Sequence, residues 1–120
     1  MTSFIVIKKK YLSLFANIRT VMNIKPVTTD KQNRTARYAK AMGHPVRIFV
    51  LELLSNHSCC YSGDLSDELM IEKSTLSQHL KELKEAELIK GKIESPRIKY
   101  CIDKKNWKEA QQFFKQSLRI

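Results

Sequence analysis

The most informative stretch of this 120-residue chain reads Lys73-Ser74-Thr75-Leu76-Ser77-Gln78-His79-Leu80-Lys81-Glu82-Leu83. Its apolar residues recur at helical spacing and continue to Ala86, so they form one stripe: Leu76, Leu80, Leu83 and Ala86. The opposite face carries Ser74, Gln78, Lys81 and Glu85, flanked by Thr75, Ser77 and Glu82. The pattern predicts an amphipathic helix that begins at a Ser74 cap, runs to about Glu87, buries its leucines and offers a polar face to a partner.

Three further helices are predicted before this one. The first begins at Arg34, places Ala36, Ala39 and Met42 on one face, and breaks at Gly43-His44-Pro45. Pro45 suits the first turn of the second, central helix, which is predicted to end near Asn56 and to be buried through Val46, Phe49, Val50, Leu53 and Leu54. The third covers about Asp64 to Met70, with Asp64 as its cap. Ile71-Glu72-Lys73 then forms a tight turn, so this helix and the next make a helix-turn-helix.

A hairpin and a last helix are predicted after it. Apolar residues alternate on both sides of Glu94-Ser95-Pro96-Arg97, namely Ile89, Gly91 and Ile93, then Ile98, Tyr100 and Ile102. From about Asn106 the helical spacing returns through Trp107, Ala110, Phe113, Phe114 and Leu118. The expected fold class is mainly α with a small β-hairpin wing, a winged helix-turn-helix.

The charge balance narrows the class of partner. The chain carries 22 Lys and Arg against 12 Asp and Glu, a net charge of +10, which favours polyanions, chiefly nucleic acid. Residues 1–29 hold five basic groups and no acid, so residues 30–120 carry +5. We expect residues 1–30 to be a basic N-terminal extension, either disordered or the product of a start assigned upstream of Met22, and residues 31–120 to form one winged-helix domain.

The region from Tyr38 to Ile102 resembles the ArsR/SmtB family of metal-responsive bacterial repressors. Three stretches carry the resemblance: Ala41-Met42-Gly43-His44-Pro45-Val46-Arg47, Gly63-Asp64-Leu65, and Lys73 to Leu83 followed by a hairpin that ends in Lys99-Tyr100-Cys101-Ile102. The resemblance implies a homodimer that binds operator DNA and releases it when a metal ion or metalloid binds. The chain departs from the family pattern at Glu87, where a glycine commonly follows the recognition helix, so this helix must end without one.

Double-stranded operator DNA is therefore the expected partner. Short polar side chains at the start of a recognition helix suit base edges and phosphates, and Gln78 can pair with adenine through two hydrogen bonds. The predicted DNA-binding residues are Ser74, Thr75, Ser77, Gln78, His79, Lys81 and Arg97. Lys90, Lys92 and Lys99 lie along the arms of the wing, where they can neutralise phosphates. The alternative is a capped helix whose polar face is solvated.

The chain is also expected to pair with a second copy of itself. The last helix is apolar on more of its circumference than a small core can cover, and in the family this helix packs with the first helix across a twofold axis. The predicted interface residues are Trp107, Ala110, Phe113 and Phe114. Such a dimer presents two recognition helices to half-sites about 34–36 Å apart. The alternative is that these aromatic residues pack only on their own domain.

The three cysteines are the candidates for an effector site. Cys59, Cys60 and Cys101 are too few and odd in number for a secreted disulfide framework. The segment before the third helix often pairs with the second wing strand, which would place Cys59 and Cys60 beside Cys101. Three thiolates suit trivalent arsenic or antimony, and a fourth ligand such as His57 would suit Cd²⁺ or Zn²⁺. Adjacent strand residues point to opposite faces, however, so both can reach Cys101 only if the segment is irregular. Redox sensing and purely structural cysteines are the alternatives.

No motif supports catalysis, since the sequence contains no phosphate loop, nucleophile triad or metal-hydrolase pattern. No required cofactor is expected. The apolar run Phe4 to Ile7 is too short to cross a bilayer, so no membrane partner is expected either, and cytoplasmic residence is the default. The function expected is a DNA-binding repressor released by a thiophilic metal or metalloid such as arsenite. Its alternatives are a regulator that responds to redox state or has no effector, and a winged-helix module for protein assembly.

Overall fold

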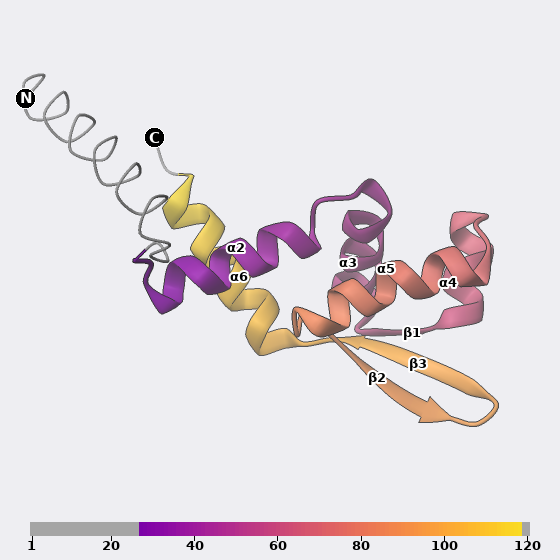
Figure 1. The fold of residues 1–120 in the computed structure, drawn as a ribbon. Coiled ribbons are helices and arrows are strands. Elements are labelled where there is room, and N and C mark those ends of the chain that lie inside the picture. Colours follow the sequence, from indigo (N-terminus) through magenta and orange to yellow (C-terminus); the bar gives the residue numbers. More distant parts are fainter. Residues whose placement is uncertain (1–26, 119–120) are drawn as a thin grey trace, which may run out of the picture.

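The computed structural model describes residues 27–118, and Figure 1 shows their arrangement. Five helices and three short strands follow one another in the order α2 (Asp30–Ala41), α3 (Pro45–His57), β1 (Cys59–Tyr61), α4 (Ser62–Leu69), α5 (Lys73–Glu85), β2 (Ile89–Glu94), β3 (Arg97–Ile102) and α6 (Lys104–Ser117). The winged helix-turn-helix prediction is confirmed. Nearly all of the predicted N-terminal extension lies outside the described residues.

Helix α2 begins four residues earlier than predicted. Thr29 and Gln32 form a reciprocal capping box, in which each side chain accepts a hydrogen bond from the other residue's backbone N–H, and this fixes the start of the helix. Tyr38 and Ala41 are buried, whereas Ala36 and Ala39 are exposed, because helix α6 packs on the Tyr38 side of α2.

The starts of the next helices are only partly as predicted. Pro45 occupies the first turn of α3, and the His44 side chain accepts a hydrogen bond from the N–H of Val46 as its cap. Helices α4 and α5 begin earlier than predicted and have no side-chain cap, so Asp64 and Ser74 lie inside the first turn of their helices. The prediction that these two residues act as caps was wrong.

The end of α5 shows how a chain without the usual glycine leaves the helix. Glu87 itself adopts the left-handed conformation, with φ of 64°. Its N–H donates to the carbonyl of Lys84, and the N–H of Leu88 donates to that of Leu83, so the helix closes on the hydrogen bonds that a glycine would normally permit. Asn106 of α6 stabilises this turn, because its side-chain amide donates a hydrogen bond to the carbonyl of Glu87 over 2.9 Å.

The three strands form one antiparallel sheet in the order β1-β3-β2. Cys59 pairs with Cys101 in the β1–β3 register, while Ile93 pairs with Ile98 near the tip of the β2–β3 hairpin. The predicted hairpin and its pairing with the segment before α4 are therefore confirmed. The core joins the sheet to the helices through fully buried residues: Val50, Leu51, Leu54, Leu65, Leu76, Leu80, Leu83, Leu88 and Ile89.

Helices α2 and α6 pack on each other apart from the helix-turn-helix. The buried Tyr38 ring stacks at a tilt on Phe113, and its hydroxyl donates to Glu109 over 3.0 Å. Arg34 forms an ion pair with the same carboxylate. In Figure 1 the start of α2 and the end of α6 lie at one end of the molecule, and the α4–α5 turn and the hairpin tip lie toward the other. The surface predicted to bind DNA and the surface predicted to pair with a second copy therefore lie at different ends of the fold.

Candidate DNA-binding surface and cysteine pair

The N-terminal half of α5 presents the polar side chains that the sequence predicts for DNA contact. Ser74, Thr75, Ser77, Gln78 and Lys81 are all exposed. Leu76, Leu80 and Leu83 on the other side are at most 2% exposed, so burial of this stripe fixes which face of the helix is turned outward. The Ser77 hydroxyl donates to the carbonyl of Lys73 over 2.8 Å, and it can still accept a hydrogen bond from a partner.

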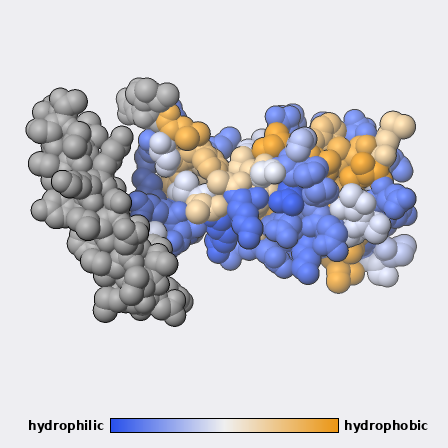
Figure 2. Space-filling view, turned by 45° about the horizontal axis from the view of Figure 1, so that its top comes forward, coloured by the Kyte–Doolittle hydropathy of each residue, from blue (hydrophilic) through white to orange (hydrophobic). Residues whose placement is uncertain are grey.

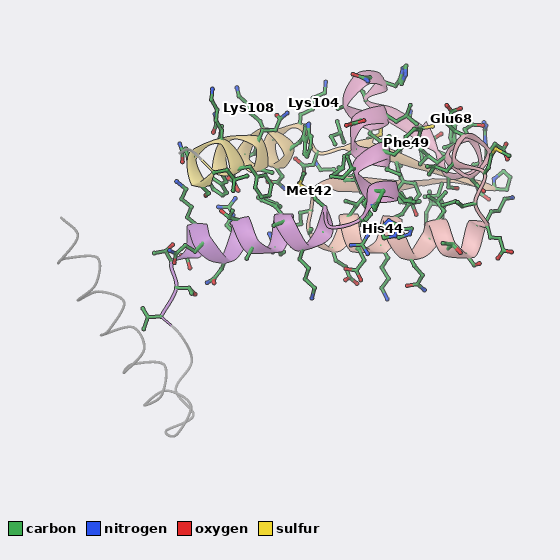
Figure 3. The ribbon with its side chains drawn as sticks, turned by 90° about the horizontal axis from the view of Figure 1, so that it is seen from above. Met42, His44, Phe49, Glu68, Lys104 and Lys108 are labelled. Carbon is green, nitrogen blue, oxygen red and sulfur yellow. A yellow bond between two sulfur atoms is a disulfide. The ribbon has the colours of Figure 1, made fainter. Side chains whose placement is uncertain are left out.

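His79 lies apart from these five side chains. It is half-buried, and its Nδ1 accepts a hydrogen bond from Nε of Arg47 over 3.1 Å. The centroid of the His44 ring lies 4.3 Å from that of His79. Figure 3 shows His44 where α3 meets α5. Burial lowers the pKa of His79, and the neighbouring His44 and Arg47 lower it further. These contacts favour a role in joining α3 to α5.

The wing carries an exposed basic surface. Lys90, Lys92 and Arg97 are exposed and Lys99 is half-buried. The Arg97 guanidinium lies over the ring of Tyr61, 3.9 Å from its centroid. The Tyr61 hydroxyl donates to the Glu94 carboxylate over 2.8 Å, which raises the pKa of Tyr61 and lowers that of Glu94. Tyr61 could not be recognised as part of this surface from the sequence, because nothing in the local pattern shows that a residue before α4 reaches the hairpin tip.

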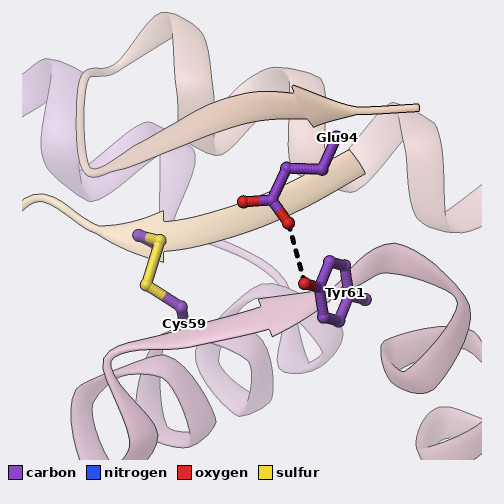
Figure 4. Close-up of a disulfide and its surroundings, with 4 residues drawn as sticks. Cys59, Tyr61 and Glu94 are labelled. Atoms are coloured by element: carbon purple, nitrogen blue, oxygen red, sulfur yellow. Dashed lines mark hydrogen bonds between the residues drawn. A yellow bond between two sulfur atoms is a disulfide. The ribbon is translucent and has the colours of Figure 1, made fainter. Parts of the chain in front are cut away.

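The cysteines separate into a pair and a single thiol. Cys59 and Cys101 form a disulfide between directly paired residues of β1 and β3, 4.0 Å apart at Cα (Figure 4). Cys60 is free and half-buried, and it packs against the core. Burial raises the pKa of its thiol, and the charge of Asp64 adds to this effect. Because β1 is regular, its neighbouring cysteines face opposite sides, and the structure brings only two of the three sulfurs together.

Within residues 27–118 no group of three or more His, Cys, Asp and Glu side chains is arranged to hold a metal ion. The predicted fourth ligand, His57, is exposed at the end of α3. No helix in this part of the chain is long and apolar enough to cross a membrane.

The predicted interface residues on α6 differ in exposure. Ala110 is completely buried in its own subunit, so it is not available to a second copy. Trp107, Phe113 and Phe114 are half-buried and pack partly against the core, while Leu118 is 74% exposed. Figure 2 shows hydrophobic surface gathered over α6. A groove of about 460 Å³ runs along the neighbouring face of α2, and it is lined by Thr29, Lys31, Gln32, Thr35, Ala36, Ala39 and Ser117.

Comparison with known sequences agrees with this geometry. Residues 44–90, which cover α3 to the start of β2, match the family model described as "Bacterial regulatory protein, arsR family". The chain is 34% identical over 65 residues to an uncharacterized HTH-type transcriptional regulator, MJ1325, of Methanocaldococcus jannaschii, a match that covers 54% of this chain and 73% of that protein. It is 33% identical over 69 residues to the HTH-type transcriptional regulator YgaV of Escherichia coli, over 58% and 70% of the two chains.

Solved structures share the fold. HlyU from Vibrio cholerae superposes with a TM-score of 0.62 at 22% identity, over 77% of this chain and all of that one. The homodimeric winged helix-turn-helix DNA-binding domain of Mb0332 from Mycobacterium bovis, described as a possible ArsR-family regulator, superposes with a TM-score of 0.59 at 21% identity, over 78% and 88% of the two chains. At these identities the likeness shows the winged helix-turn-helix fold alone.

Proposed function

The chain belongs to the ArsR family of bacterial regulatory proteins, and from this premise we propose that it represses transcription as a homodimer bound to operator DNA. It is a transcriptional regulator with a winged helix-turn-helix fold, which is not a class of enzyme. The observation that carries the proposal is the outward face of α5, where five exposed polar side chains stand beside a basic wing. We assign base reading to Gln78 and Ser77, and phosphate contacts to Lys81 and Arg97.

The second copy is proposed to bind on the α2–α6 side. The exposed Ala36 and Ala39 line a groove into which the backbone of a neighbouring helix can approach closely, and Leu118 adds apolar surface at the end of α6. Mb0332, which shares the fold, is described as homodimeric. Because this side lies away from the wing tip, pairing through it leaves both α5 helices free to enter successive major grooves, about 34–36 Å apart.

The effector is proposed to act on Cys59 and Cys101. In the reduced protein these two thiols face each other across the β1–β3 ladder and can bind a thiophilic ion such as As(III), Sb(III), Cd²⁺ or Zn²⁺. The disulfide favours a second candidate, redox sensing, in which the pair is oxidised by an organic disulfide. The two thiols lose two protons and two electrons to that disulfide, which leaves as two thiols. In the cytoplasm, the proposed location, such protein disulfides are commonly transient and regulatory.

The test is an electrophoretic mobility shift on duplex DNA from upstream of the protein's own gene. We expect a sequence-selective complex that weakens with salt and changes when arsenite, antimonite, cadmium, zinc or oxidised glutathione is added. Cys59→Ser and Cys101→Ser should abolish the response, while the matched variant Cys60→Ser should keep it. An effect of arsenite on the reduced protein supports metalloid sensing, and an effect of oxidised glutathione alone supports redox sensing. A response that survives in Cys101→Ser contradicts the assignment to this pair.

A further inference from the structure

Tyr61 contacts both charged residues that flank the turn of the wing. Glu94 and Arg97 are directly paired at the end of the β2–β3 ladder. Tyr61 donates its hydroxyl proton to the carboxylate of Glu94 and places its ring under the guanidinium of Arg97. These contacts span 33 and 36 positions of the sequence, so they fix the hairpin tip to a distant part of the fold. In Figure 4 the hydroxyl of Tyr61 reaches Glu94 across the sheet.

Strand β1, which ends at Tyr61, is joined to the wing at both of its ends. Strand β1 has three residues, and its hydrogen-bonded register with β3 runs from Cys59↔Cys101 to Tyr61↔Lys99. Cys59 and Tyr61 lie two positions apart and therefore on the same face. The disulfide joins one end of β1 to β3, and the Tyr61 contacts join the other end to the tip. Helix α4 starts at the next residue, so Tyr61 lies at the junction of β1 and this helix.

Tyr61 contacts the negative charge of Glu94 and the positive charge of Arg97 in different ways. The carboxylate of Glu94, which would repel a DNA phosphate, accepts the hydrogen bond from the Tyr61 hydroxyl, and Glu94 is partly buried. The guanidinium of Arg97 is stacked through its flat face, and its N–H donors lie in the plane, at the edges. Within residues 27–118 Arg97 forms no side-chain hydrogen bond and no ion pair within 4 Å, although its charge helps to lower the pKa of the neighbouring Glu94. The stack on the Tyr61 ring therefore leaves the N–H donors of Arg97 available to a partner.

We propose that Tyr61 is a positioning residue for DNA binding, which orients Arg97 toward a phosphate of the operator backbone. This inference rests on the proposed function. A free arginine side chain loses rotamer freedom when it binds, and an arginine already held on an aromatic ring loses less. Loss of the ring is therefore expected to weaken DNA binding, although Tyr61 itself touches no DNA.

The experiment uses the full chain and a duplex that the wild-type protein selects from a random-sequence DNA pool. Affinity is measured at several salt concentrations under one redox condition. Tyr61→Leu should weaken binding roughly three- to tenfold, the range expected for one unrestrained long side chain. Tyr61→Phe, the matched control, keeps the ring and should bind within about twofold of wild type. Arg97→Ala should weaken binding and reduce the salt slope by about one.

The decisive readout is the coupling between the two residues. In the Arg97→Ala background, Tyr61→Leu should have no further effect. If the two effects multiply instead, or if Tyr61→Leu binds as tightly as wild type, the inference is overturned. Should Tyr61→Leu fail to fold, Arg97→Lys decides, because the exposed lysine keeps the charge and loses the flat stack. A three- to tenfold loss with an unchanged salt slope supports the inference, and wild-type affinity overturns it.

The experiment distinguishes failure of the proposed function from failure of the proposed role of Tyr61. If the wild-type protein selects no duplex at all, DNA binding itself is refuted. If it selects one and only the Tyr61 variants behave differently from expectation, the proposed function stands and the positioning role falls.

Discussion

Helices α5 and α6 differ in how completely they bury their apolar faces, although they have 13 and 14 residues and are both amphipathic. Helix α5 places Leu76, Leu80 and Leu83 fully in the core, so its exposed side is polar. Helix α6 has a single fully buried residue, Ala110, and keeps Phe113 and Phe114 half-exposed. The apolar face of α5 is therefore covered within the chain, whereas part of the apolar face of α6 is left uncovered, where the proposed second copy would bind.

The largest effect is expected on the inner face of α5. Leu80→Ala removes a side chain that is 2% exposed, and the lost burial plus the cavity should lower the free energy of unfolding by about 2–5 kcal/mol. The measurement is urea unfolding followed by circular dichroism. Lys81→Ala, on the exposed side of the same turn, is the control and should change stability by no more than about 0.5 kcal/mol. A similar loss in both variants would show that α5 is not organised as described.

A charge in the α2 groove should break the dimer and leave the subunit folded. Ala39→Glu places a carboxylate at an exposed position, where it does no harm in the monomer but is buried without a partner in the proposed interface. The dimer dissociation constant, measured by sedimentation equilibrium, should rise at least about tenfold. Lys108→Glu is the control, because Lys108 points outward from α6 (Figure 3). Unchanged association of Ala39→Glu would place the interface elsewhere.

The turn after α5 should become more stable with a glycine. Glu87 has φ of 64°, a conformation that costs an L-residue roughly 1–2 kcal/mol and costs glycine almost nothing. Glu87→Gly should therefore raise the free energy of unfolding by about 0.5–1 kcal/mol, after the extra chain entropy of glycine is subtracted. The control Glu85→Gly, at the last residue of α5, should instead lower the free energy of unfolding, by at most about 1 kcal/mol. A loss of stability in Glu87→Gly would contradict the left-handed turn.

The smallest effect concerns His79, on the side of α5 that faces α3. Its pKa is lowered in the folded protein, so the unfolded chain takes up a proton first as the pH falls. Stability should thus be complete above the ordinary histidine pKa of about 6.5 and decline as the pH falls below it. Thermal unfolding between pH 5 and 8 measures this decline, and His79→Gln should make it shallower. An equally steep decline in His79→Gln would assign the effect to other groups.

Helix positions and the wing were predictable because they follow from spacing that is local in sequence. Leu76, Leu80 and Leu83 identified α5, and the alternation around Pro96 identified the hairpin. The spacing of Ala36 and Ala39 placed them on one face of α2 but could not show that they are exposed, because this depends on where α6 packs. The pairing of Cys59 with Cys101 needed only the register of β1 on β3, whereas the contacts of Tyr61 with Glu94 and Arg97 depend on side-chain placement across the sheet.

The central claim is that the exposed face of α5 reads DNA, and one titration tests it most directly. The full chain and its Ser77→Ala/Gln78→Ala variant are titrated with the duplex selected by the wild type and with a scrambled duplex, at two salt concentrations. We predict that the variant loses about 1–3 kcal/mol of binding free energy on the selected duplex, and that its affinity for the scrambled one is unchanged. Equal preference of wild type and variant for the selected duplex would contradict the claim.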